Sequence, residues 1–189
     1  MYLFFDTETT GIPRKWNAPV TDLNNWPRMV QIAWVIYNEI GEELEEQNHI
    51  IVPENYTIPY HVTQIHGIST KRAKEEGKDL KEVLELFAAA LASVQVVVAH
   101  NISFDEKIIG AEFLRKKVVH DFYKKQQICT MKSTTHVTKI PGKYGYKWPK
   151  LSILYRHLFN ETFAEQHNAL ADIRATARCF WELRARKLL

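Results

Sequence analysis

Apolar residues in the first half of the chain occur in short runs that are typical of β-strands. Tyr2–Phe5 is the first such run, and Val30–Asn38 and Leu44–Val52 are the next two. The segment Glu39–Gly41 between those two contains a glycine, which suits the turn of a hairpin. Val94–Ala99 is a continuous run rich in β-branched residues, as expected of a strand that is buried on both faces.

Helical spacing of apolar residues begins after Asp79, which can cap the N-terminus of a helix. The apolar positions of this helix repeat every three or four residues: Leu80, Val83, Leu84, Phe87 and Leu91. Asn101 or Ser103 can cap a second helix with an apolar inner side: Ile108, Ile109, Phe113 and Leu114. Two more helices are predicted at Lys150–Phe159 and Asn168–Lys187. This order of elements favours an α/β layered fold with a mixed sheet.

The length and composition fit one folded domain over residues 1–189. Apolar residues make up 46% of the chain and charged residues 25%, both close to globular averages. The first apolar run has no basic residues before it and stops at Asp6, so we expect no secretory signal. No run reaches the roughly 18–20 apolar residues of a membrane span. Cys129 and Cys179 match no zinc spacing, which favours a cytoplasmic protein with reduced thiols.

Charge is unevenly distributed, although the net charge is only +3. Residues 39–46 are acidic, whereas residues 115–150 contain a single carboxylate, Asp121, and ten basic side chains: Arg115, Lys116, Lys117, Lys124, Lys125, Lys132, Lys139, Lys143, Lys147 and Lys150. Aromatic residues are interleaved there: Tyr123, Tyr144, Tyr146 and Trp148. This segment is either an ordinary solvated basic face or a phosphate-binding surface with aromatic platforms for bases.

Four carboxylates stand at the ends of predicted elements. Asp6 and Glu8 lie two residues apart at the end of the first strand, so strand alternation puts both on one face. Asp105 lies in the first turn of the helix after the buried strand, and Asp172 lies near the start of the last helix. An acidic residue early in a helix often serves only as a cap or dipole partner, which would explain Asp105 or Asp172 alone. The four together are better explained by one shared site.

Such a site needs cations, because two carboxylates ~4 Å apart repel each other by roughly 4 kcal/mol at an effective dielectric constant of about 20. All-oxygen ligands favour Mg²⁺ or Mn²⁺ over zinc. Two of these ions, about 3.5–4 Å apart, can hold the attacking and leaving oxygens of a phosphodiester in line. His167 can take a proton from the attacking water if it lies in the loop before the last helix. The pattern therefore indicates phosphodiester hydrolysis with two metal ions.

Three segments of the sequence resemble the exonuclease motifs of the DEDDh family: FDTETTG (Phe5–Gly11), HNISFDEKII (His100–Ile109) and HNALADIRATA (His167–Ala177). This family, within the ribonuclease-H-like superfamily, includes the proofreading subunit of bacterial replicative DNA polymerase. The segment VTQIHGIS (Val62–Ser69) is similar to a stretch common in that proofreading branch. The resemblance spans residues 2–181 and implies a ribonuclease-H-like exonuclease fold, a central mixed five-stranded sheet flanked by helices.

The resemblance also implies roles for individual residues. The metal ligands would be four carboxylates, with His167 as the general base: Asp6, Glu8, Asp105 and Asp172. The backbone at Thr9 would hold the 3′ end of the terminal nucleotide, and Ile12 would wedge against its base. His66 and Asn101 are further candidates for lining the substrate pocket, with a purely structural role as the alternative.

The sequence leaves several alternatives open. Residues 13–28 form a longer link than many relatives have after the first motif, and its tryptophans, Trp16 and Trp26, either pack locally or contact substrate. We expect a 3′→5′ exonuclease that acts on DNA, as a single strand or a 3′ end, and releases nucleoside monophosphates. An exoribonuclease of the same family is the first alternative. A non-catalytic, nucleic-acid-binding subunit docked on a DNA polymerase is the second, and a polymerase is a possible partner of the enzyme as well.

Overall fold

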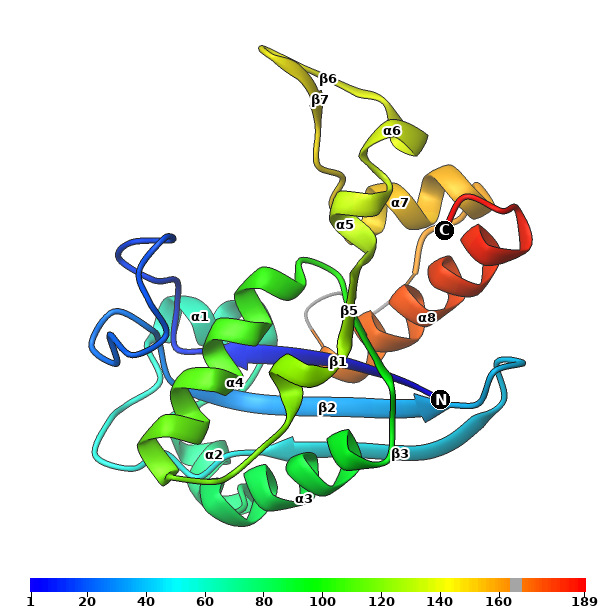
Figure 1. Cartoon of the computed structure of the whole chain (residues 1–189). Helices are drawn as coiled ribbons and strands as arrows, with labels where there is room; N and C mark the ends of the chain where they lie inside the picture. Colours follow the sequence, from blue (N-terminus) through cyan, green and yellow to red (C-terminus); the bar gives the residue numbers. More distant parts are fainter. Residues whose placement is uncertain (164–167) are drawn as a thin grey trace.

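The core of the protein is a mixed sheet of five strands, seen in a computed structural model that describes residues 1–163 and 168–189 (Figure 1). The strands lie in the order β3-β2-β1-β4-β5. β1 is antiparallel to β2, which is antiparallel to β3, whereas β4 runs parallel to β1 and β5. The bounds of the strands are β1 Tyr2–Thr9, β2 Met29–Tyr37, β3 Glu43–Ile50, β4 Val96–Ala99 and β5 Gln126–Cys129.

Helices and a second small sheet complete the described part of the chain. The helices are α1 Tyr60–His66, α2 Thr70–Glu76, α3 Leu80–Ala92, α4 Ile102–Lys116, α5 Thr130–Ser133, α6 Thr135–Thr138, α7 Leu151–Phe159 and α8 Ala169–Ala185, with a short 3₁₀ helix at Phe122–Lys124. The second sheet is a hairpin of β6 Ile140–Gly142 and β7 Gly145–Lys147. None of the helices in the described ranges has the length and apolar character needed to cross a membrane.

The strands and long helices that the sequence predicts are present, with shifted ends. The first strand extends past its apolar run, Tyr2–Phe5, to Thr9, so Asp6 and Glu8 lie toward its end, as predicted. The turn between β2 and β3 is confirmed, since the Asn38 amide donates to the carbonyl of Glu42 at 3.0 Å. Residues 13–28 contain neither helix nor strand, as their prolines predict.

The basic segment 115–150 contains elements that the sequence pattern did not predict. Its Gln126–Cys129 stretch is β5, which pairs in parallel with β4 and closes one edge of the sheet. The stretch is short and mostly exposed, so it lacks the apolar run by which β4 is recognised. The helices α1, α2, α5 and α6 were also not predicted, and each spans only four to seven residues.

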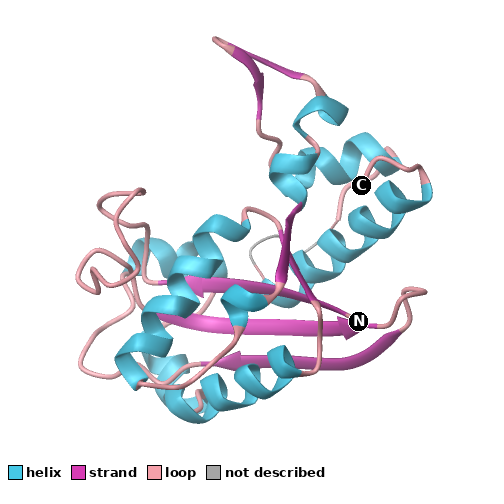
Figure 2. Cartoon of the chain, in the orientation of Figure 1, coloured by secondary structure: helices cyan, strands magenta, loops and turns pink. Residues whose placement is uncertain are grey.

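Alternation along β1 sorts its side chains between the two helical layers. Leu3 and Phe5 belong to the core beneath α3 and α4. Tyr2 and Phe4 belong to the core on the opposite face, beneath α8 (Figure 2). Because successive strand residues point to opposite faces, the residues that follow Phe4 at every second position also face α8.

Candidate active site

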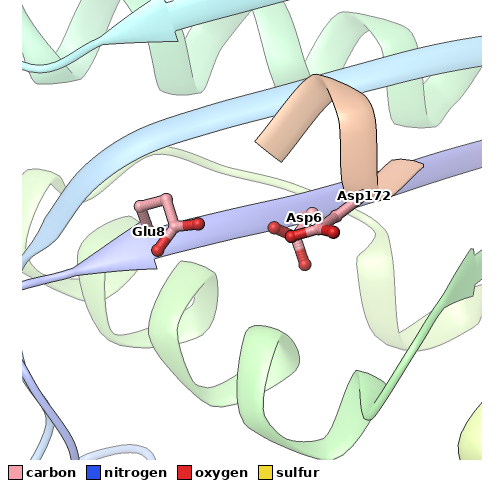
Figure 3. A group of neighbouring side chains, drawn as sticks. All are labelled: Asp6, Glu8 and Asp172. Carbon is pink, nitrogen blue, oxygen red and sulfur yellow. The ribbon is translucent and has the colours of Figure 1, made fainter. Parts of the chain in front are cut away.

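Asp6 and Glu8 continue the alternation of β1 onto the face that α8 covers. Asp172 lies in the first turn of α8 and comes down onto the same face. One carboxylate oxygen from each of these three residues lies within 4.8 Å of those of the other two (Figure 3). The structure thus brings together three of the four carboxylates that the sequence predicts as metal ligands.

The start of α8 is fixed by a side-chain cap. Asn168 has extended backbone angles, and its Oδ1 accepts a hydrogen bond from the Leu170 amide at 3.2 Å. This cap sets the first turn of the helix, and Asp172 is therefore held at the end of α8 that lies nearest Asp6. His167, the predicted general base, lies in 164–167, outside the described residues.

Asp105 reaches the same region from the other helical layer. It is buried in the first turn of α4, where its Oδ1 accepts hydrogen bonds from the Thr7 amide at 3.1 Å and the Thr7 hydroxyl at 2.7 Å. Thr7 points away from Asp6 and Glu8 because it stands between them on the strand. Asp105 is close enough to raise the pKa of both, although it is not one of the three converging carboxylates.

The electrostatics of the group favour a bound cation. Burial, followed by the charges of Asp105, Glu8 and Asp172, raises the pKa of Asp6 well above its usual range. Burial and then Asp172 and Asp105 raise the pKa of Glu8 to about 8. Burial also raises the pKa of Asp105 to about 7, against the lowering effect of its hydrogen bonds from Thr7. Carboxylates that resist ionisation in this way, with oxygen as the only donor atom, fit a hard divalent cation.

A pocket of about 650 Å³ opens beside these carboxylates. Asp6 and Asp172 form part of its wall, and Asn101 lines the same pocket. Asn101 takes a left-handed conformation with φ 73° just before α4, and its side chain makes no capping hydrogen bond. The predicted cap of α4 by the side chain of Asn101 is therefore wrong, since its Oδ1 accepts from the Ser103 hydroxyl at 3.3 Å instead.

His100 lines the same pocket and is a residue to which the sequence analysis gave no role. Its Nε2 lies 3.0 Å from the carbonyl oxygen of Pro149, and its Nδ1 lies 3.0 Å from the hydroxyl of Thr130. A carbonyl can only accept, so Nε2 carries the proton and Nδ1 accepts from Thr130. Burial lowers the pKa of His100 to about 4, which keeps the ring neutral. Its position beside Asn101 in the second motif was the available signal.

The other predicted substrate-binding residues are placed differently. Thr9 is buried, and its hydroxyl donates to the carbonyl of Gly11 at 2.6 Å, shaping the turn after β1. Ile12 follows this turn and is 73% exposed, which suits a side chain that contacts substrate. His66 accepts from the Ile68 amide at 3.1 Å and lines a separate hollow that reaches Asn168. It is not among the residues that line the pocket of Asp6 and Asp172.

The two tryptophans of residues 13–28 have different environments. Trp26 is 3% exposed, and its indole Nε1 donates to the carbonyl of Pro19 at 2.9 Å. Trp16 is 59% exposed, and its ring centroid lies 5.8 Å from that of Phe104, the residue before Asp105. Trp26 therefore packs locally, whereas Trp16 is exposed and contacts Phe104 on α4.

The mixed five-stranded sheet and its flanking helices form a ribonuclease-H-like fold, with three candidate carboxylates on β1 and α8. The model of the exonuclease family matches residues 3–180. The chain belongs to this family, which confirms the resemblance of its motifs to the DEDDh 3′→5′ exonucleases.

Solved structures of exonuclease I share this fold. The zinc-bound complex of E. coli exonuclease I with single-stranded DNA has a TM-score of 0.73 and 20% identity over 98% of this chain and 40% of that one. Exonuclease I from Methylocaldum szegediense has a TM-score of 0.76 and 20% identity over the same shares. The E. coli enzyme with a dT13 oligonucleotide has a TM-score of 0.75 and 18% identity over 98% of this chain and 41% of that one. The chain thus spans about two fifths of the length of these structures. No curated protein matches the sequence.

Proposed function

We propose that this chain is a metal-dependent exonuclease that removes nucleoside monophosphates one at a time from the 3′ end of DNA. The observation that carries the proposal is the convergence of Asp6, Glu8 and Asp172 on one face of β1. Three carboxylates with oxygens within 4.8 Å of one another are costly without a cation, and membership of the exonuclease family supplies the reaction.

Different residues of the chain would have different roles in this reaction. Asp6, Glu8 and Asp172 would hold the cations, with Asp105 as the fourth ligand, and Thr7 keeps the Asp105 carboxylate oriented. A pair of Mg²⁺ or Mn²⁺ ions would activate the attacking water and stabilise the charge that develops on the leaving oxygen. His167 would accept the proton of that water, because a neutral imidazole is an effective general base.

The terminal nucleotide would occupy the pocket beside the carboxylates. Asn101 lines this pocket, whereas Ile12 and the aromatic face of Trp16 lie on the link that follows β1. Ile12 is proposed to wedge against the terminal base, with the backbone of Thr9 holding the 3′ end. These assignments combine the exposure of Ile12 and Trp16 with the roles that the family implies.

DNA is the proposed substrate because the structures similar to this chain include exonuclease I complexes with single-stranded DNA, dT13 and dA16. Discrimination against RNA depends on contacts with the 2′-hydroxyl, and RNA is therefore the alternative that the substrate test must address. Association with a DNA polymerase and a cytoplasmic location remain proposals that follow from the family and from the sequence.

The test is the degradation of end-labelled single-stranded DNA, duplex DNA and RNA of one sequence. We expect stepwise shortening from the 3′ end of DNA with Mg²⁺ or Mn²⁺, and no product in EDTA. Asp6→Asn should abolish the reaction, whereas Glu85→Gln should not, since it removes an exposed carboxylate on α3. Cleavage that survives chelation or Asp6→Asn would overturn the site, and preferential degradation of RNA would overturn the substrate assignment. Binding without any cleavage would indicate the non-catalytic alternative.

A further inference from the structure

The hairpin β6–β7 stands away from the body of the protein (Figures 1 and 2). The arm, defined as residues 139–148, contains this hairpin with the residue on either side of it. Its strands are paired through Ile140 with Lys147 and Gly142 with Gly145, and its side chains are exposed or partly exposed. The arm contacts α6 through Tyr146, whose ring lies edge-on to that of His136 with the ring centroids 5.7 Å apart.

The arm and its base carry a strongly positive charge. Residues 122–160 contain no Asp or Glu at all. Five exposed lysines lie in or beside the arm: Lys132, Lys139, Lys143, Lys147 and Lys150. Within residues 1–163 and 168–189, none of the five has a carboxylate at ion-pairing distance. Unneutralised lysines concentrated on one projecting element suit a polyanionic partner.

Aromatic rings lie among these charges and face solvent. Tyr144 at the tip of the arm is 91% exposed, and Trp148 at its base is 62% exposed. The ammonium group of Lys132 lies 5.9 Å from the centre of the Trp148 ring, and that of Lys143 lies 5.1 Å from the Tyr144 ring. Exposed rings beside cations are the features with which proteins bind unpaired bases and the phosphates between them. A duplex would offer phosphates but no unstacked bases.

The base of the arm is also part of the candidate active site. Trp148, Pro149 and Lys150 line the pocket that Asp6 and Asp172 line. The hydrogen bond between His100 Nε2 and the Pro149 carbonyl ties this base to the residue that follows β4. A nucleic-acid strand whose 3′ end lies beside the carboxylates therefore contacts Trp148 first, and its more distant nucleotides reach the lysines of the arm.

We propose that the arm binds single-stranded nucleic acid on the 5′ side of the terminal nucleotide and so guides the strand into the pocket. The inference rests on the proposed function for the direction of the strand. Lys139, Lys143 and Lys147 contact phosphates, while Trp148 and Tyr144 stack on bases. The preferred substrate is consequently a single strand, long enough to reach from the pocket to the arm.

The test compares two triple variants of equal charge change in an Asp6→Asn background, which prevents cleavage. The arm variant is Lys139→Gln, Lys143→Gln and Lys147→Gln. The control is Lys71→Gln, Lys74→Gln and Lys81→Gln, exposed positions on α2 and α3 that lie across the molecule from the arm (Figure 1). All six side chains are exposed, so both variants should fold, and circular dichroism checks this.

Binding is measured by fluorescence anisotropy with a labelled single strand of about 20 nucleotides and with a duplex of the same sequence. The arm variant should bind the single strand about tenfold or more weakly, and the control within about twofold of the parent. Three lost phosphate contacts should reduce the slope of log affinity against log salt by about 2. Trp148→Ala should lower the affinity for the single strand more than the affinity for the duplex. Equal affinities for the arm and control variants would overturn the proposal.

A small substrate separates this proposal from the proposed function. The p-nitrophenyl ester of thymidine 5′-monophosphate occupies only the catalytic pocket, so in the active background the arm variant should hydrolyse it within about twofold of the unaltered protein. Equal losses of activity in the arm variant on the ester and on the long single strand would overturn the guiding role. Failure of the unaltered protein to hydrolyse either substrate would overturn the proposed function, while the binding experiment would still report on the arm.

Discussion

Thr7 donates two hydrogen bonds to a single oxygen of Asp105, one from its amide at 3.1 Å and one from its hydroxyl at 2.7 Å. These bonds join β1 to the first turn of α4 at the level of the candidate metal site. They fix the orientation of the Asp105 carboxylate and lower its pKa, partly offsetting the effect of burial. Thr7 thereby acts on the site through Asp105 without contributing a ligand itself.

Replacing Thr7 tests this positioning role. Thr7→Val keeps the shape of the side chain but removes the hydroxyl donor, and a loss of about 10- to 100-fold in metal affinity or activity is expected, as for other supporting residues of metal sites. Thr7→Ser keeps a hydroxyl and should recover most of the loss. Titration of activity with Mg²⁺ measures both variants, and equal Mg²⁺ requirements in Thr7→Val and the unaltered protein would contradict the role.

The carboxylate group makes the metal-free protein less stable as the pH rises. The folded pKa of Glu8 is about 8 and that of Asp105 about 7, both above the ordinary values of 4.5 and 3.8. The folded state therefore binds more protons than the unfolded state between about pH 4 and 8, so the stabilising contribution present at low pH is lost across that window. Unfolding in urea with EDTA, at several pH values, measures this loss.

Two comparisons with Asp6→Asn separate the effect of these carboxylates on stability from that of the other groups that titrate. Asp6→Asn removes one of the repelling charges, and its free energy of unfolding should fall less steeply across this window than that of the unaltered protein. Mg²⁺ should raise the melting temperature of the unaltered protein at pH 8 more than that of Asp6→Asn. Parallel pH profiles for the two proteins in EDTA would show that the charges do not repel as described.

The two tryptophans of residues 13–28 should respond differently to truncation. Trp26→Ala leaves a cavity beneath the segment and removes the hydrogen bond to Pro19, so we expect a loss of about 3–5 kcal/mol in the free energy of unfolding. Trp16→Ala should leave stability nearly unchanged and raise KM for DNA, because the ring is exposed beside Phe104. Urea unfolding and steady-state kinetics separate the two, and a large loss of stability in Trp16→Ala would refute the assignment.

His100 should stabilise the fold only while its ring is neutral. Its folded pKa of about 4 lies below the ordinary value of 6.5, so the unfolded chain binds the extra proton first as the pH falls. The contribution of His100 is complete above about pH 6.5 and is lost on the way down to about pH 4. The difference in free energy of unfolding between the unaltered protein and His100→Gln should thus shrink over that range. A difference that stays constant would contradict a buried neutral ring.

Local pattern alone determined much of the fold and placed three of the four candidate carboxylates. The period of two along β1 puts Asp6 and Glu8 on one face, and helical spacing puts Asp172 in the first turn of the last helix. Both periods depend on backbone geometry that each residue shares with its immediate neighbours. The strands β2, β3 and β4 were recognisable for the same reason, and the three motifs indicated the exonuclease family.

Only the tertiary structure decided which elements meet. β5 is a strand because β4 offers it an edge, and its own four residues carry too little apolar pattern to show this. Asp105 reaches the site from the layer opposite α8, and Thr7 turned out to be its partner, because their contact joins residues far apart in the chain. Residues 139–148 of the basic segment likewise form an arm whose base is held at the pocket by the hydrogen bond between His100 and the Pro149 carbonyl. Such contacts depend on how layers pack, and no local period encodes them.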